Sequence, residues 1–218
     1  FLLISIFYKA FYIRFFAEKW IFQTEYSRSK FIKKYFVKKE NTYVVPNAIG
    51  DEFVESLKKD EDTIIQEDSK KIVIFCPTAN YPHKNLEILI NLAELWKNSK
   101  NDKSLKIVLP IKDDKKFIAF ASKKNVLGAF DFIGPYNYAN ASNHYLKSNI
   151  VVMPSLLESF STSYLEGLLA KKPLVVPDQR YSKEICKNYA FYYDKKDPFS
   201  LYLVIKQIVE KNNGKLLD

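Results

Sequence analysis

The chain has 218 residues, of which 47% are hydrophobic and 27% charged, as in an ordinary soluble globular protein, and it is long enough for one large domain or for one domain and part of another. The net charge of +9 fits a solvated, lysine-rich surface, with attraction to anionic lipid or to an anionic substrate as alternatives. The two cysteines and two histidines exclude a disulfide framework and a histidine-rich metal site, and they suit the reducing cytoplasm. No zinc-finger spacing, RNA-recognition signature or basic heptad region occurs, so nucleic acid is not an expected partner.

In the first fifty residues, helices are expected at 1–19 and 27–38 and short strands at 20–24 and 42–46. The apolar run at the start is too short to span a membrane and is interrupted by Lys9 and Arg14. An amphipathic helix packed on another domain is therefore expected there, with peripheral binding to an anionic membrane as the alternative. Because the chain begins at Phe1 without a preceding strand–helix unit, we expect residues 1–50 to be the remnant of an N-terminal domain.

The segment 51–70 is highly charged and is predicted to be a linker, with a short helix near 53–57. From residue 71 onward, apolar runs alternate with helical patterns. Strands are expected at 71–76, 105–111, 130–133, 150–153, 174–176 and 190–193, and helices at 85–97, 114–124, 139–147, 163–171 and 183–187. This alternation predicts an α/β fold over 71–197, with a parallel sheet covered by helices on both faces, followed by a C-terminal helix within 198–218.

Two glutamates, Glu158 and Glu166, lie eight positions apart between a predicted strand and the helix that follows it. In open parallel sheets, ligands bind at the carboxyl ends of the strands, so this acid pair is a candidate for holding a sugar and a ribose. A structural alternative exists. Ser163 with Glu166, and Ser155 with Glu158, each have the spacing of a helix capping box.

A second candidate site precedes the predicted helix 85–97, where His83 and Lys84 follow a strand. The helix dipole disfavours a cation at a helix start, so Lys84 there is consistent with an anion bound at the helix N-terminus. The alternative is a lysine whose stem lies along the surface.

Two further strand ends carry candidate residues. Gly134 would allow a flat ring to approach the backbone, and Tyr136 or Tyr138 could stack on that ring, although an ordinary turn is the alternative. Arg180 would pair with a phosphate or with Glu184 four positions later, and the ion pair is the favoured interpretation.

These motifs together resemble the donor-binding half of the retaining group 1 (family 4) glycosyltransferases, which have the GT-B fold. The resemblance is colinear over nearly the whole chain. It is carried by YVVPNAIGDEF at 43–53, PHKNL at 82–86, PSLLESF at 154–160, LEG at 165–167 and PLVV at 173–176. It implies a Rossmann-like nucleotide-sugar-binding domain at 71–197 and an acceptor-side remnant at 1–50.

The resemblance also implies roles for individual residues. Glu166 would accept hydrogen bonds from the ribose of the donor, Glu158 would lie near the hydroxyls of the transferred sugar, and Lys84 would neutralise the donor diphosphate. The backbone N–H groups of Phe160, Ser161 and Thr162 would approach the sugar or phosphate, and the base would lie near Gly134 and Tyr136. The resemblance implies no metal or other cofactor.

The sequence departs from the family pattern at several positions. Thr78 and Ala79 stand where the family has a phosphate-binding arginine, so that Arg180 or His83 would have to replace it. Serines replace the usual glycines of the glutamate loop, at Ser159 and Ser161.

The expected activity is that of a cytoplasmic hexosyltransferase, located in the cytoplasm or at the cytoplasmic face of the membrane. It would move a sugar from a nucleotide sugar to a glycan or lipid-linked acceptor in cell-surface polysaccharide synthesis, with retention of configuration. The alternatives are a nucleotide-sugar epimerase, or a nucleotide-binding fragment without activity of its own.

Overall fold

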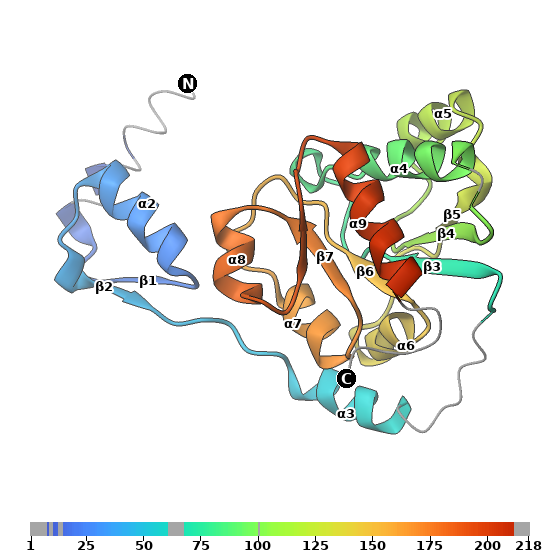
Figure 1. Cartoon of the computed structure of the whole chain (residues 1–218). Coiled ribbons are helices and arrows are strands. Elements are labelled where there is room, and N and C mark those ends of the chain that lie inside the picture. Colours follow the sequence, from blue (N-terminus) through green and yellow to red (C-terminus); the bar gives the residue numbers. More distant parts are fainter. Residues whose placement is uncertain (1–7, 9–10, 13–14, 61–67, 100, 212–218) are drawn as a thin grey trace.

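The computed structural model describes residues 8, 11–12, 15–60, 68–99 and 101–211. It divides into a small N-terminal module and a larger α/β domain (Figure 1). The predicted helix 1–19 lies largely outside the described residues. Within it Tyr8, Phe11, Tyr12, Phe15 and Phe16 are helical and exposed.

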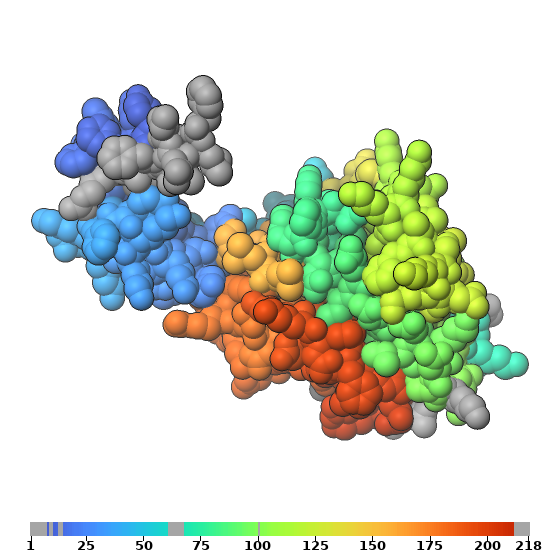
Figure 2. Space-filling view, turned by 90° about the horizontal axis from the view of Figure 1, so that it is seen from above, coloured from blue at the N-terminus to red at the C-terminus, as the bar shows by residue number. Residues whose placement is uncertain are grey.

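The N-terminal module consists of strand β1 (Trp20–Phe22), helix α2 (Glu25–Tyr35), the short 3-10 helix η1 (Lys39–Asn41) and strand β2 (Thr42–Val44). The two strands pair in parallel, and α2 packs on β1 through Phe31, whose ring lies 4.9 Å from that of Phe22 and 6.1 Å from that of Trp20. Thr24 caps α2 because its side chain accepts a hydrogen bond from the Ser27 N–H. Figure 2 shows this blue module projecting from one side of the larger domain.

The larger domain contains a six-stranded sheet in the order β5-β4-β3-β6-β7-β8, in which all the paired strands are parallel. The strands are β3 (Lys71–Phe75), β4 (Ser104–Leu109), β5 (Phe130–Phe132), β6 (Ile150–Val152), β7 (Leu174–Pro177) and β8 (Phe191–Tyr193). The chain adds β4 and β5 on one side of β3 and then returns to place β6 on the other side. The order therefore reverses between β3 and β6, which is where doubly wound sheets bind ligands.

Helices cover both faces of this sheet, as the alternation of strand and helix patterns predicts (Figure 1). One face is covered by α4 (Glu87–Asn98), α5 (Lys115–Lys123) and α9 (Pro198–Lys211), and the other by α3 (Asp51–Asp60), α6 (Ala141–Leu146), α7 (Thr162–Leu169) and α8 (Arg180–Cys186). Successive strand residues point to opposite faces. In β3, Ile74 belongs to the first core and Phe75 to the second, and both are fully buried. Strand β3 is therefore apolar on both sides after Lys71, which is why it reads as a nearly continuous hydrophobic run.

The charged segment predicted as a linker begins with the packed helix α3. Its Phe53 is fully buried and its Leu57 is 6% exposed, and both lie in the second core beside α6. The short helix expected near 53–57 is thus present and longer, and it belongs to the domain because its one apolar stripe is buried. Residues 61–67 of the same segment lie outside the described residues.

Element ends differ from the predicted ones where capping decides them. Helix α8 begins three residues earlier than the predicted 183, because Gln179 and Ser182 form a capping box there. The predicted helix 139–147 is a 3-10 turn, η4 (Tyr138–Asn140), followed by α6. Two more 3-10 turns, η2 (Pro82–Lys84) and η3 (Leu127–Ala129), precede α4 and β5.

Candidate active site

The carboxyl ends of β3 and β6 bring together two segments that are far apart in sequence. The Leu156 N–H donates to the His83 carbonyl at 2.7 Å, which joins the loop after β6 to η2. Beside this contact the Lys84 Nζ lies 2.5 Å from Glu158 Oε1. The Lys84 side chain is 17% exposed and that of Glu158 is 9% exposed, so water screens this ion pair only weakly.

The local backbone explains why Lys84 is turned toward the site. Pro82 begins the 3-10 turn, and Asn85 ends it in the left-handed region at φ 54°, so the chain reverses just before α4. Beneath the lysine, burial raises the pKa of the Cys76 thiol well above its usual range, and the nearby Lys84 charge opposes this only in part. Cys76 is therefore a neutral core residue, whereas Lys84 is the cation that this loop presents.

Glu166 lies in the second turn of α7 and is only 3% exposed. Two tyrosines satisfy its carboxylate: the Tyr145 hydroxyl donates to Oε2 at 2.6 Å and the Tyr138 hydroxyl to Oε1 at 3.1 Å. The capping-box alternative is wrong, because Ser161 is the N-cap of α7 and Ser163 lies inside the helix. Ser155 starts no helix either. The burial of this carboxylate is therefore not explained by helix capping.

The loop after β6 leads directly into the N-terminus of α7. Phe160 and Ser161 precede the helix, and Thr162 is its first residue. Three residues therefore separate Glu158 from the start of α7, and the helix dipole favours a bound anion at that end.

Just after β5, the backbone at Gly134 lies in the left-handed region, which favours glycine. Gly134 has φ +68°, and a Cβ added there would meet no atom within 4 Å. The Tyr136 ring lies 4.8 Å from the His144 ring and 6.0 Å from that of Phe75, so it is anchored in the second core. Burial, followed by the Glu166 charge, raises the pKa of Tyr136 above its usual range. Tyr136 and Glu166 are thus close enough to interact electrostatically.

The favoured Arg180–Glu184 ion pair is wrong. The Glu184 carboxylate instead accepts the Glu25 and Tyr26 backbone N–H groups at 2.5 and 2.8 Å, so it binds the N-terminus of α2. Arg180 is exposed at the first residue of α8, and the described interactions do not join it to Lys84 or Glu158.

His83 is exposed as well, and its ring stacks on that of Tyr81 with centroids 5.8 Å apart. Neither predicted replacement for the arginine is therefore brought to the Lys84–Glu158 pair by a described contact.

The model of the family described as glycosyl transferases group 1 matches residues 57–216. The chain belongs to this family. The match covers the whole larger domain from the end of α3 to the end of α9. No curated protein sequence matches the chain.

Solved structures of other glycosyltransferases share this fold. One, from Rickettsia africae, has a TM-score of 0.76 and 15% identity over 94% of this chain and 57% of its own. The structure of Anabaena Alr3699/HepE in complex with UDP-glucose has a TM-score of 0.76 and 15% identity, and the match covers 97% of this chain and 59% of the other. WaaG, a glycosyltransferase involved in lipopolysaccharide biosynthesis, has a TM-score of 0.67 and 18% identity, and the match covers 87% of this chain and 53% of the other. The chain thus has the fold of the C-terminal domain of GT-B glycosyltransferases and spans little more than half the length of these relatives.

Three residues of this group 1 chain contact residues of the site, although no sequence pattern marks them as functional. Tyr145 supports Glu166 from inside α6, where a helical period explains it as core. The Thr24 hydroxyl donates to the Ser159 carbonyl at 3.0 Å and so ties the N-terminal module to the glutamate loop. The carbonyl of Lys195 accepts from the Asn85 side chain at 3.3 Å, next to Lys84, and its ammonium donates to Gln179.

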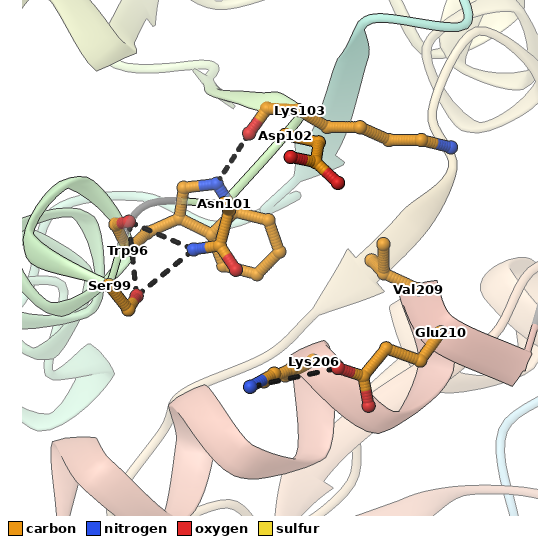
Figure 3. Close-up of a pocket in the computed structure, with 8 residues that line it drawn as sticks. All are labelled: Trp96, Ser99, Asn101, Asp102, Lys103, Lys206, Val209 and Glu210. Atoms are coloured by element: carbon orange, nitrogen blue, oxygen red, sulfur yellow. Dashed lines mark hydrogen bonds and ion pairs between the residues drawn. The ribbon is translucent and has the colours of Figure 1, made fainter.

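The described residues also line several hollows outside this constellation. A pocket of about 460 Å³ lies where the N-terminal module meets the glutamate loop, and it is lined by Ile21, Phe22, Gln23, Ser27, Val45, Pro46, Asn47 and Ser159. Another, of about 300 Å³, lies at the opposite edge of the sheet, before β4 and beside the last turns of α9 (Figure 3). Its Trp96 indole N–H donates to the Lys103 carbonyl at 2.8 Å, and its Lys206 pairs with Glu210 at 3.6 Å, so its polar groups bind one another.

The described residues contain no group of three or more His, Cys, Asp and Glu side chains placed to hold a metal ion. No helix among them combines the length and apolar character needed to cross a membrane.

Proposed function

We propose that this chain is the donor-binding half of a retaining family 4 glycosyltransferase, a hexosyltransferase that moves a sugar from a nucleotide sugar to a glycan or lipid-linked acceptor. The observation that carries the proposal is the close pairing of Lys84 with Glu158 at the strand-order reversal, with the buried Glu166 on the helix that follows the Glu158 loop. The complexes of Alr3699/HepE with UDP and UDP-glucose support a nucleotide-sugar donor.

Each residue then has a task that fits its chemistry. Glu166, a buried acceptor in the second turn of α7, binds the ribose hydroxyls. Lys84 and the N-terminus of α7 stabilise the diphosphate, on which negative charge develops as the anomeric bond breaks. Glu158 orients the sugar hydroxyls. Because Glu158 also holds the ammonium of Lys84 in place, it positions the cation before the donor arrives.

The cellular setting belongs to the same proposal. A role in cell-surface polysaccharide synthesis is supported by WaaG, whose structure is that of a lipopolysaccharide enzyme. The net charge of +9 suits a protein that works at the anionic cytoplasmic face of a membrane. We propose further that the reaction needs no metal ion. Donor binding that is unchanged by EDTA would support this, and its loss would overturn it.

Isothermal titration calorimetry of the chain with UDP, GDP and ADP tests the proposal. We expect one of them to bind, and the variant Glu166→Ala to weaken its affinity at least tenfold, because the ribose would lose a charged acceptor. Glu210→Ala is the matched control, since this exposed glutamate lies at the opposite edge of the sheet. Failure of all three nucleotides to bind at millimolar concentration would refute the proposal.

Turnover is a separate expectation. The chain covers 53–59% of the length of the structures named above. In GT-B enzymes, sugar transfer from the donor is expected to take place between two domains. We therefore expect this chain alone to bind donor and to transfer sugar poorly. Consumption of a nucleotide sugar without any acceptor would instead favour an epimerase.

A further inference from the structure

Both carboxylate oxygens of Glu166 already accept a hydrogen bond from a tyrosine. Tyr145 occupies Oε2 at 2.6 Å and Tyr138 occupies Oε1 at 3.1 Å. Each oxygen can accept a second hydrogen bond, but Glu166 is only 3% exposed, so the two ribose hydroxyls of a nucleotide need room that a tyrosine now fills. A ribose hydroxyl can bind there only if one of the two tyrosine hydroxyls moves away from Glu166.

Tyr145 is held in place from all sides. It is fully buried, and its ring meets those of Phe53 and Phe75 edge to face, with centroids 5.4 and 5.1 Å apart. Its hydroxyl cannot leave Glu166 without opening the second core, because these packed rings leave it no other position. Tyr145 therefore supports the carboxylate permanently.

Tyr138 is held less firmly, although its ring also packs on that of Phe53. It lies on the short 3-10 turn η4, is 37% exposed, and makes the longer of the two hydrogen bonds. Burial, together with the Glu166 charge, raises the pKa of Tyr138 to about 12, so this hydroxyl carries its proton at neutral pH and can donate. If it left Glu166, water could solvate it at once.

We propose that the Tyr138 hydroxyl takes the place of a ribose hydroxyl on Glu166 Oε1 in the nucleotide-free protein and is displaced when a ribonucleotide binds. This inference rests on the proposed function. Tyr138 thereby keeps a buried carboxylate satisfied until the substrate arrives, since an unpaired buried charge is costly. It also makes tight binding depend on a ligand that brings its own hydroxyl donors, and so selects ribonucleotides.

The variant Tyr138→Phe removes the competing hydroxyl and keeps the ring, which packs 6.1 Å from that of Phe53. We expect it to bind the best of UDP, GDP and ADP about three- to tenfold more tightly than the unmodified chain, because the ribose no longer displaces a donor. The 2′,3′-dideoxy form of the same nucleotide cannot displace Tyr138, so its affinity should change less than twofold. Tyr145→Phe, the matched control, should weaken binding of the ribonucleotide.

Calorimetry with both nucleotides on the three proteins decides the matter, after circular dichroism has shown each variant to be folded. Weaker ribonucleotide binding by Tyr138→Phe would make Tyr138 a direct ligand and overturn the inference, as would an equal gain for the dideoxy form. If nucleotide binds and Glu166→Ala abolishes binding while Tyr138→Phe changes nothing, the inference fails and the proposed function stands. If no nucleotide binds, both fail.

Discussion

The ion pair between Lys84 and Glu158 should contribute to stability as well as to donor binding, and the two can be separated. Lys84→Met keeps the length and apolar stem of the side chain but removes its charge. The Glu158 carboxylate, 9% exposed, then loses its partner at 2.5 Å. A glutamine at position 158 would keep the shape and remove the charge, so the variant Glu158→Gln completes a double-mutant cycle.

The magnitude follows from the burial of the two side chains. Breaking a fully buried pair by removing one partner costs about 3–5 kcal/mol, whereas exposed pairs are worth about 0.2–1 kcal/mol. With exposures of 17% and 9% the pair lies near the buried limit but keeps some access to water. We expect Lys84→Met to lower the free energy of unfolding by about 2 kcal/mol, or Tm by about 4–8 °C in a chain of this size. Glu158→Gln should cost less, because the long lysine can turn toward solvent.

Urea unfolding followed by circular dichroism measures the four corners of the cycle. We expect the double variant to be more stable than the sum of the single losses predicts, with a coupling energy of at least about 1 kcal/mol. Lys183 and Asp178 provide the control, since this pair is 2.6 Å long but 53% and 51% exposed. Its coupling energy should stay below about 0.5 kcal/mol. Equal coupling in the two pairs would show that burial at the site does not strengthen the interaction, and the reasoning would be wrong.

Three more outcomes are expected. In a sugar-transfer assay, Lys84→Ala should lower the rate of transfer about a hundredfold, as for loss of one oxyanion donor, and a change below threefold in kcat would count against its proposed role. Glu184→Ala should destabilise the start of α2 by about 1 kcal/mol, seen as faster amide exchange of Tyr26, while Glu184→Gln should retain part of the effect. Burial, then the Lys147 charge, lowers the pKa of His144 from 6.5, so the unfolded chain takes up this proton first and stability should fall as pH drops below about 6.5. His144→Gln should flatten that dependence in urea titrations at pH 7.5 and 5.5, and an unchanged slope would contradict it.

The sheet could be predicted from the sequence because its strands are buried on both faces. Apart from Lys71, the runs at 71–76, 150–153 and 174–176 are apolar, and each proved to be a strand within a residue or two. Strand order was less accessible. The position of β6 beside β3 depends on long-range pairing, which no local pattern in either strand specifies.

The helix α3 illustrates the opposite limit. Its surroundings are charged, and only Phe53 and Leu57 mark an apolar stripe, so composition favours a linker. The structure buries both residues because α6 offers a matching apolar face. A partner that is distant in sequence therefore decided whether these ten residues were a connector or a part of the core.

The site shows the same division between local and distant information. Lys84 and Glu158 could be singled out as candidates because an unexpected charge in a strand-to-helix loop is a local signal, and Glu166 because it follows in the next helix. Tyr145 could not, because a tyrosine at a core position of α6 satisfies the hydrophobic pattern whether or not its hydroxyl meets a carboxylate. The error over Glu184 has the same origin: Arg180 is near in sequence, but the backbone N–H groups of α2 lie closer in space.

These missed contacts have one feature in common that bears on function. Thr24 binds the carbonyl of Ser159, and Glu184 binds the first turn of α2, so two hydrogen-bonded connections join the N-terminal module to the α/β domain beside the glutamate loop. A rotation of the module that stretched them would pull on the residue next to Glu158 before it disturbed the sheet, because that loop has no strand partner of its own. The placement of Glu158, and through it of Lys84, therefore depends on the module as well as on the domain that carries both residues.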